Sequence, residues 1–329
     1  MFSGILYIVV PCYNEEAALP LSATVLRQHL DDMISATRVS PRSRVLLVND
    51  GSTDSTWSII QDLHRNYPTT FSGLNLSRNR GHQNALLAGL LSVRNQADLT
   101  ISIDADLQDD INAMDEMVDL YNQGIDIVYG VRSKRTTDSV FKRATATLFY
   151  RLMNALGAET VDNHADFRLM SKRALAALSE FGETNLFLRG LVPLIGFSHA
   201  TVTYERSERV AGNSKYPVGK MLSFALDGIT SFSVKPVRLI SDLGFVVFFF
   251  SLAASVYVLA RYFTGHTVVG WASSFLSIWA IGGLILISLG VIGEYISKIY
   301  IETKARPRFI VESFIDSPDT PQQPSENQE

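Results

Sequence analysis

Residues 99–110 read LTISIDADLQDD, an alternating apolar run that ends in a cluster of carboxylates. The alternation predicts a strand over residues 99–104, in which residues i and i+2 face the same way. Asp104 and Asp106 are therefore expected to project together, with Gln108 two residues further on. Two neighbouring carboxylates repel each other unless a cation lies beside them, and Mg²⁺ or Mn²⁺ takes oxygen ligands of this kind. The stretch predicts a metal-diphosphate site; the alternative is an acidic loop or helix N-cap after a strand.

Length and composition limit the class of protein. A chain of 329 residues can hold a full catalytic domain and a smaller part. The net charge of -4 gives no support for nucleic acid as a partner. Cys12 is the only cysteine, which excludes an intrachain disulfide and is compatible with a reducing compartment. Residues 1–10 have no basic start and predict a first strand rather than a signal peptide.

Strand-like and helix-like runs alternate along the first part of the chain. The predicted strands are residues 5–10, 44–49, 73–76, 99–104 and 126–129. The predicted helices are residues 17–30, 55–65, 82–94 and 113–123. This alternation predicts an α/β fold, a mostly parallel sheet with helices on both faces.

Three polar motifs follow the first, second and fourth predicted strands: PCYNE (11–15), NDGSTD (49–54) and DADLQ (104–108). In such sheets ligands bind beyond the carboxyl ends of the strands, so the motifs are expected to converge. Asp50 is an acceptor suited to a base N–H or a ribose hydroxyl, and Tyr13 can flank a flat base ring. The alternative for residues 49–54 is a turn with a helix N-cap, and the two interpretations are compatible.

PCYNE, NDGSTD, NRGHQ (79–83) and DADLQ, in that order, resemble glycosyltransferase family 2, whose members use nucleotide sugars and have a GT-A fold. Later segments resemble the polyprenyl-phosphate branch of this family, and most of all its bactoprenol glucosyl transferases: DFRLMS (166–171), TNLFLRG (184–190), RVAGNSKY (209–216) and GITSFS (228–233). The likeness runs from about residue 7 to residue 310. Asn49, where the family often has Asp, and Ala165, where Gly is usual, depart from the pattern.

The resemblance implies a role for each matched residue. The residues that would hold the uridine are Pro11, Tyr13, Glu15 and Asp50. The residues that would gather the metal, Mg²⁺ or Mn²⁺, and the diphosphate are Asp104, Asp106 and Gln108. Arg132 would meet phosphate, and Arg209 and Lys215 would bind the nucleotide sugar from a mobile loop that closes over the site. Each cation has an alternative as a solvated surface charge, which we prefer for Lys134 and Arg135.

Asp106, Asp166 and Arg132 are the predicted catalytic residues. For Asp166 three interpretations stay open: it orients the acceptor, helps to hold the ion, or only pairs with Arg168. His82 and His164 are expected to be structural or to lie behind the residues that touch substrate.

The resemblance implies transfer of a hexose, with glucose expected, from a UDP-sugar to polyprenyl phosphate, for cell-envelope glycan modification. A lipid phosphate is already an anion near pH 7 and needs no strong general base to attack the anomeric carbon. The departing UDP builds negative charge, which a metal and basic side chains would stabilise. A single displacement of this kind inverts the anomeric centre. A UDP-N-acetylhexosamine or GDP-mannose donor is the alternative.

Two apolar runs, residues 243–260 and 267–293, contain no charged residue, and Arg261 lies between them. At 1.5 Å per residue each can cross roughly 30 Å of hydrocarbon. They predict a two-helix membrane hairpin, because neither shows the polar face of a core helix. Residues 218–236 have apolar side chains at helical spacing, and this amphipathic segment either lies in the interface or packs on the catalytic domain.

Basic residues flank the predicted hairpin on one side: Lys215, Lys220, Lys235, Arg238, Lys298, Lys304, Arg306 and Arg308. The short connection between the two runs, residues 261–266, has one residue of full positive charge, Arg261. By the positive-inside rule the catalytic domain and both termini are expected to be cytoplasmic, at the inner (plasma) membrane.

The predicted parts are a catalytic domain (1–212), a loop and juxtamembrane segment (213–237), a hairpin (238–297) and a C-terminal segment (298–329) that is disordered from about 316. The resemblance also suggests a homotetramer. A processive polysaccharide synthase should carry a Q-x-x-R-W motif, and no Arg-Trp pair occurs here. A membrane-tethered nucleotide-binding protein without catalysis is the remaining alternative.

Overall fold

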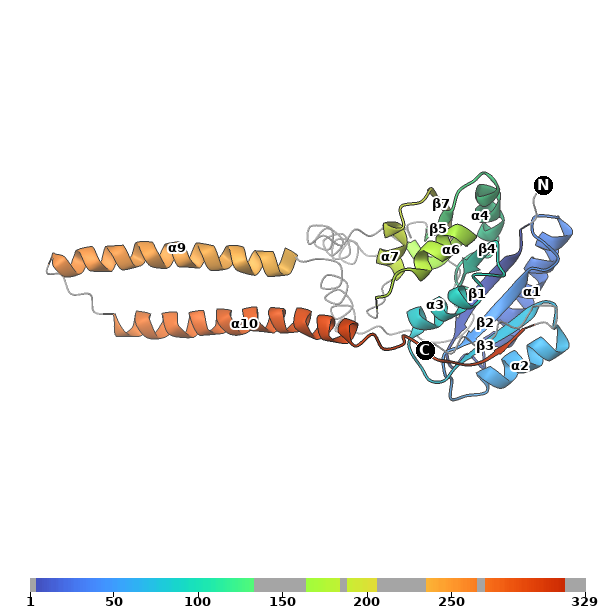
Figure 1. Ribbon diagram of the computed structural model, residues 1–329, viewed down its shortest axis with the longest axis horizontal. Helices are drawn as coiled ribbons and strands as arrows, with labels where there is room; N and C mark the ends of the chain where they lie inside the picture. The colour runs from blue at the N-terminus through green and yellow to red at the C-terminus, as the bar shows by residue number, and fades with distance from the viewer. Residues whose placement is uncertain (1–3, 133–163, 184–187, 206–234, 265–269, 317–329) are drawn as a thin grey trace. The chain divides into compact units, whose positions relative to one another are not determined.

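The computed structural model describes residues 4–132, 164–183, 188–205, 235–264 and 270–316 (Figure 1). The chain divides into two compact units. The first contains the sheet and its helices together with the segment from Pro307 onward, and the second contains two long helices. Several predictions lie outside the described residues: the roles of Arg209 and Lys215, the amphipathic segment up to Val234, and disorder after Asp316.

Four parallel strands form the centre of the sheet, in the order β4 (Leu99–Ser102), β1 (Leu6–Cys12), β2 (Arg44–Asn49) and β3 (Phe71–Leu76). All of their residues are buried, as expected for strands covered on both faces. The first two strands pair in register from Tyr7 opposite Arg44 to Cys12 opposite Asn49. The predicted mostly parallel arrangement is confirmed for this part of the sheet.

Four further strands extend the sheet: β5 (Ile127–Arg132), β6 (His164–Ser171), β7 (His199–Tyr204) and β8 (Val311–Ile315). Among the described residues the full order is β7-β5-β6-β4-β1-β2-β3-β8. β6 lies antiparallel between β4 and β5, and β8 lies antiparallel against β3. The last three strands were not predicted. Buried Asp166 and Arg168 interrupt the apolar pattern of β6, and β8 is far in sequence from its partner.

Helices cover both faces of the sheet (Figure 1). One apolar core lies under α1 (Leu19–Ser35), α2 (Thr56–Asn66) and α4 (Ala113–Asn122). The other lies under α3 (His82–Ser92), α6 (Lys172–Ser179) and α7 (Leu188–Leu194). Alternation along β1 divides its side chains, so that Ile8 joins the first core and Val9 the second.

Helix α3 packs very closely on the sheet at Gly89. A Cβ atom there would lie 2.5 Å from Val9 Cγ1 and 2.7 Å from Val48 Cγ2. This close approach fixes the helix on the strands, and its first residue, His82, therefore has a defined place near their carboxyl ends.

The acidic motif does not continue the strand. β4 ends at Ser102, and the backbone N–H of Leu107 donates to the carbonyl of Asp104 at 3.2 Å, closing a turn. Leu107 adopts a φ of 43° in this turn. The prediction of a strand to Asp104 is therefore wrong at its end, and the relative orientation of Asp104 and Asp106 is set by a turn rather than by strand alternation.

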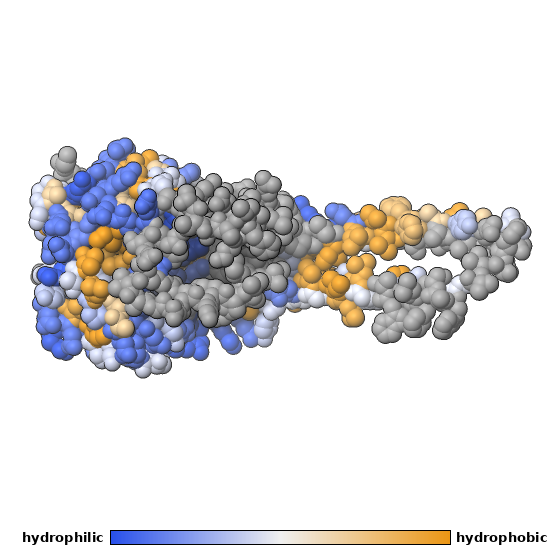
Figure 2. Space-filling view, turned by 180° about the vertical axis from the view of Figure 1, so that it is seen from behind, coloured by the Kyte–Doolittle hydropathy of each residue, from blue (hydrophilic) through white to orange (hydrophobic). Residues whose placement is uncertain are grey.

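The second unit contains α9 (Lys235–Phe263) and α10 (Trp271–Thr303). In the described part of the chain, one segment is long and apolar enough to cross a membrane, Ile281–Thr303, with a mean hydropathy of 1.7 and none of it buried. Hydrophobic side chains gather on the described surface of these helices (Figure 2). Phe250 and Leu286 are among the exposed ones. One long apolar C-terminal helix is thus present, and a second span stays a prediction.

Candidate active site

Asp50 joins the ends of three neighbouring strands. Its backbone N–H donates to the carbonyl of Cys12 at 2.9 Å, and its two carboxylate oxygens accept from the N–H groups of Arg80 at 2.7 Å and Gly81 at 2.9 Å. Burial raises the pKa of Asp50, and the two N–H groups oppose that shift. The carboxylate predicted to bind uridine thus holds the loop before α3, and contact with a nucleotide stays a prediction.

Gly51 makes this contact between loops possible. Its φ is 62°, and a Cβ atom would lie 2.4 Å from the carbonyl carbon of Arg78 and from the nitrogen of Asn79. Only glycine fits here, because both the backbone conformation and the space exclude a side chain.

The PCYNE motif also binds the NDGSTD motif and the first residue of α2. The N–H of Asn14 donates to Ser52 Oγ at 3.0 Å, and the N–H of Glu15 donates to Thr56 Oγ1 at 2.9 Å. Tyr13 is 45% exposed beside these contacts, whereas Pro11 is buried within β1. The structure therefore brings together the four residues predicted for uridine, and their function stays a prediction.

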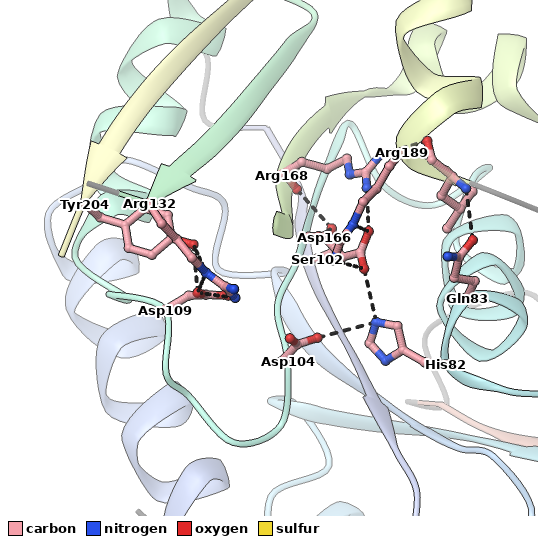
Figure 3. A network of polar contacts seen from close by, with 11 residues as sticks. His82, Gln83, Ser102, Asp104, Asp109, Arg132, Asp166, Arg168, Arg189 and Tyr204 are labelled. Atoms are coloured by element: carbon pink, nitrogen blue, oxygen red, sulfur yellow. Dashed lines mark hydrogen bonds and ion pairs between the residues drawn. The ribbon is translucent and has the colours of Figure 1, made fainter. Parts of the chain in front are cut away.

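His82 lies between two carboxylates, one in the turn after β4 and one on β6 (Figure 3). Its Nε2 is 3.4 Å from Asp104 Oδ1 and 3.5 Å from Asp166 Oδ2. Burial disfavours the imidazolium, but the hydrogen bond with Asp166 and the charge of Asp104 together raise the pKa of His82. Burial and the nearby carboxylates Asp166, Asp109 and Asp106 raise the pKa of Asp104, against the charge of His82.

Asp166 is buried and is bound by two arginines. Its Oδ1 accepts from Arg168 Nη2 at 2.8 Å and from Arg189 Nε at 3.2 Å, and its Oδ2 accepts from Arg189 Nη2 at 3.1 Å. Although burial favours protonation, His82 and the arginines hold the pKa of Asp166 well below its usual range. Asp166 pairs with Arg168 but also with Arg189 and His82, so it is an anion whose oxygens are both occupied, and its role in the reaction stays a prediction.

Arg132 is held by a buried acid on the other side of the site (Figure 3). Its Nε and Nη2 lie 3.0 and 2.9 Å from Asp109 Oδ1, and the hydroxyl of Tyr204 donates to the same oxygen at 2.7 Å. This places Arg132 on β5 with a fixed guanidinium. Arg132 was predicted from the sequence to be functional, whereas Asp109 and Tyr204 were not singled out.

The predicted metal ligands suit a hard cation that keeps several other ligands. Asp104 has a side chain 37% exposed, and the charge of Asp106 is near enough to raise its pKa. The N–H of Gln108 donates to Asp106 Oδ1 at 3.3 Å. Within the described ranges, no group of three His, Cys, Asp or Glu side chains is arranged to hold a metal. Mg²⁺ commonly takes only one or two protein carboxylates, with water and phosphate completing its shell, so these residues fit such an ion.

Two further residues of this network lie in motifs that the sequence analysis quoted. His82, in NRGHQ, was expected to be structural or to lie behind the residues that touch substrate, and its contacts with Asp104 and Asp166 are compatible with that; Arg189, in TNLFLRG, had no assigned role. The motif match was a signal for both. Asp109 and Tyr204 gave no such signal, because a single Asp in an acidic loop and a Tyr at a strand end are common.

A mixed, mostly parallel sheet with these acidic and basic side chains at its edge is a GT-A-like α/β fold. The chain belongs to glycosyltransferase family 2, because the family model described as Glycosyl transferase family 2 matches residues 7–179. It is 52% identical over 309 residues to the uncharacterised glycosyltransferase YkoT of Bacillus subtilis (strain 168), covering 94% of this chain and 91% of that protein.

The chain is also 38% identical over 308 residues to the bactoprenol glucosyl transferase of Shigella phage SfX, covering 93% of this chain and 98% of that protein. Among solved structures, the mannosyltransferase PcManGT from Pyrobaculum calidifontis aligns with 93% of this chain and 86% of its own, at 16% identity and a TM-score of 0.43.

Proposed function

We propose that this glycosyltransferase moves a hexose, with glucose as the first candidate, from a UDP-sugar to polyprenyl phosphate with inversion at the anomeric carbon. The observation that carries the proposal is the extent of the likeness to the phage bactoprenol glucosyl transferase. It covers 93% of this chain and so extends well beyond the family match at residues 7–179 into the apolar C-terminal part.

The site chemistry supports this transfer. A lipid phosphate is a ready nucleophile, so the site needs no free carboxylate base, and Asp166 with its two arginine partners is unsuited to be one. The reaction instead needs positive charge where the diphosphate leaves. Arg132 supplies it from β5, and Arg209 and Lys215 are proposed to add to it.

Asp104, Asp106 and Gln108 are proposed to hold Mg²⁺ or Mn²⁺. When bound, such an ion supplies charge that stabilises the leaving diphosphate. Tyr13, Glu15, Pro11 and Asp50 are proposed to form the uridine side of the donor site.

The acceptor's polyprenyl chain calls for a bilayer next to the catalytic unit. The unburied apolar segment Ile281–Thr303 supports membrane association. We further propose a second span in α9, a catalytic unit on the cytoplasmic face of the inner membrane, and a homotetramer. Accessibility of single cysteines introduced at exposed positions on either side of the proposed spans, measured from each side of membrane vesicles, tests the topology. Mass measurement of the detergent-solubilised protein tests the tetramer.

The decisive experiment uses the purified full-length protein in detergent with undecaprenyl phosphate and a panel of radiolabelled nucleotide sugars. We expect a labelled lipid product with UDP-glucose that disappears on chelation and returns with Mg²⁺ or Mn²⁺. Product formed only from a UDP-N-acetylhexosamine or GDP-mannose would change the donor and leave the acceptor intact. Binding of UDP without transfer to any polyprenyl phosphate would contradict the proposal and favour a nucleotide-binding protein without catalysis.

A further inference from the structure

The carboxyl edge of the sheet has two functional halves. The loops joined by Asp50 follow β1, β2 and β3, on one side of β4. Asp166 on β6 and Arg132 on β5 lie on the other side of β4, and α7, which carries Arg189, packs against β6. Asp104, directly after β4, lies between the halves. The proposed uridine residues occupy the first half, and in the second half Arg132 is proposed to serve the donor's diphosphate, whereas Arg189 has no assigned ligand.

Arg189 is held rigidly but is not enclosed. Its Nε and Nη2 donate to Asp166, whereas its Nη1 has no bond to any described residue and its side chain is 36% exposed. Burial disfavours the charge of Arg189, but Asp166 keeps its pKa raised. The guanidinium is therefore a fixed cation with one edge available to a ligand.

A second fixed guanidinium lies near it. Arg132 is bound to Asp109 and is close enough to Arg189 for the two charges to oppose each other. Arg189 also interacts with the charge of Asp104. Two arginines, each anchored by its own buried carboxylate, can each hold a phosphoryl group, because the planar guanidinium binds phosphate with paired hydrogen bonds.

We propose that Arg189 binds the phosphate of the lipid acceptor and that Asp166 is the positioning residue that aims it, an inference that rests on the proposed function. Arg189 is assigned to the acceptor because Arg132 and the proposed metal already supply positive charge for the donor diphosphate, whereas Arg189 is a further fixed cation whose charge interacts with Asp104. An anion held there is next to Asp104, where the donor diphosphate is proposed to bind. Asp166 thus acts through Arg189 and not as a base.

The test measures binding and turnover separately with full-length protein in detergent. Arg189→Gln is compared with wild type for equilibrium binding of a short-chain prenyl phosphate and of UDP, and for the KM of each substrate. We expect binding of the prenyl phosphate to weaken about 10- to 100-fold through loss of a charge-assisted hydrogen bond, while UDP affinity stays within about twofold. Arg65→Gln, which removes an exposed arginine from α2, is the matched control and leaves both unchanged.

Arg189→Lys keeps the charge and guards against a folding defect, so it should recover part of the lost affinity. Asp166→Asn should raise the KM for the lipid phosphate and leave the KM for the donor unchanged. In the double variant with Arg189→Gln the KM for the lipid phosphate should rise little further, since Asp166 acts through Arg189. A selective loss of UDP affinity in Arg189→Gln would assign Arg189 to the donor diphosphate and overturn the inference. Unchanged binding of prenyl phosphate by Arg189→Gln would also overturn the inference, even if the wild-type protein is active. A wild-type protein that binds prenyl phosphate but transfers no sugar would contradict only the proposed function.

Discussion

At the residue scale, the end of β2 depends on a carboxylate and a glycine that act through backbone groups. Asp50 accepts from the N–H groups of Arg80 and Gly81, and Gly51 leaves space for the backbone of Arg78. These contacts fix the loop that leads to His82. A motif residue such as Asp50 can therefore contribute to the site by holding a neighbouring loop in place.

Gly51→Ala should weaken UDP binding about tenfold or more and lower the thermal unfolding midpoint. The substitution adds a Cβ atom at a positive φ and brings it into contact with backbone atoms, which cannot move aside as a side chain can. Gly124→Ala is the matched control, since Gly124 has a φ of 93° but no atom within 4 Å of the new Cβ. Equal effects of the two substitutions would show that the contact with the neighbouring loop is unimportant.

Asp106→Ala should lower the transfer rate about 100-fold or more, because a divalent ion at a leaving diphosphate contributes several kcal/mol to transition-state stabilisation. Initial rates over a titration of Mn²⁺ measure the effect, and the variant should also need more metal for half-maximal rate. Asp62→Asn removes an exposed carboxylate on α2 and serves as the control. Full activity of Asp106→Ala, or of wild type in EDTA, would remove the metal from the mechanism.

At the element scale, two residues, Asp126 and Asn75, each make hydrogen bonds that join parts of the sheet distant in sequence. Asp126, just before β5, accepts from Ser171 at the end of β6, from Ser198 before β7, and from Arg173 on α6. At the opposite edge, Asn75 on β3 donates to Glu312 on β8 at 2.8 Å and accepts from Asn49 at 2.6 Å. The strands that were hardest to predict are thus secured by polar side chains.

The Asp126 contacts predict a pH-dependent stability. The hydrogen bond from Arg173, with Ser198 and Ser171, lowers the pKa of Asp126 to about 2, against the opposing effect of burial. A lowered pKa in the folded state gives stability that is complete above the ordinary value of 3.8 and is lost as the pH falls towards 2. Asp126→Asn should lower the unfolding midpoint at pH 7 by about 2–4 °C, and this difference from wild type should shrink below about pH 4.

Thermal unfolding in detergent, monitored by intrinsic fluorescence, measures both effects. Asp62→Asn should show neither, because its ion pair with Arg65 is exposed. A constant difference between wild type and Asp126→Asn across this pH range would contradict the assignment.

Removal of β8 should destabilise the catalytic unit. Truncation after Arg308 exposes the edge of β3 and removes the hydrogen bond that Asn75 donates to Glu312. It also removes Phe309, which packs against the second apolar core. We expect a lower unfolding midpoint and concentration-dependent aggregation, because an open strand edge pairs with other chains. Truncation after Asp316 keeps the strand and is the control. Light scattering and thermal unfolding distinguish the two proteins.

At the scale of the whole molecule, the catalytic unit and the long helices present different surfaces to solvent. The apolar segment of α10 has no buried part, whereas the sheet has cores on both faces. A helix with such exposed apolar side chains is stable in lipid, where its backbone bonds are satisfied internally. We therefore expect the second unit to need a bilayer or detergent.

Leu286→Arg should reduce the fraction of protein that resists carbonate extraction from membranes. Leu286 is 71% exposed, so an arginine would be tolerated in water but costs about 2.5–3.5 kcal/mol at the centre of a membrane span. Leu21→Arg is the matched control, because Leu21 is 50% exposed on α1 of the catalytic unit. If both variants extract as wild type does, Leu286 lies outside the hydrocarbon.

Much of the architecture could be predicted because it depends on local patterns. Apolar alternation and helix periodicity identified β1 to β5 and the helices between them, and the motif order identified the family. β6 was missed because Asp166 and Arg168 place buried charge within a strand, which is stable only with partners from elsewhere in the chain. β7 and β8 were missed because their pairing is non-local.

The sequence by itself determined the family, the acidic motif after β4, and the apolar character of the C-terminal part, since composition and short-range spacing carry that information. The tertiary structure decided which side chains meet: His82 between Asp104 and Asp166, Arg189 on Asp166, and Arg132 on Asp109. It also ended β4 before Asp104 and closed the sheet with β8. These features depend on distances between residues far apart in the chain, and only packing of the strands and helices sets those distances.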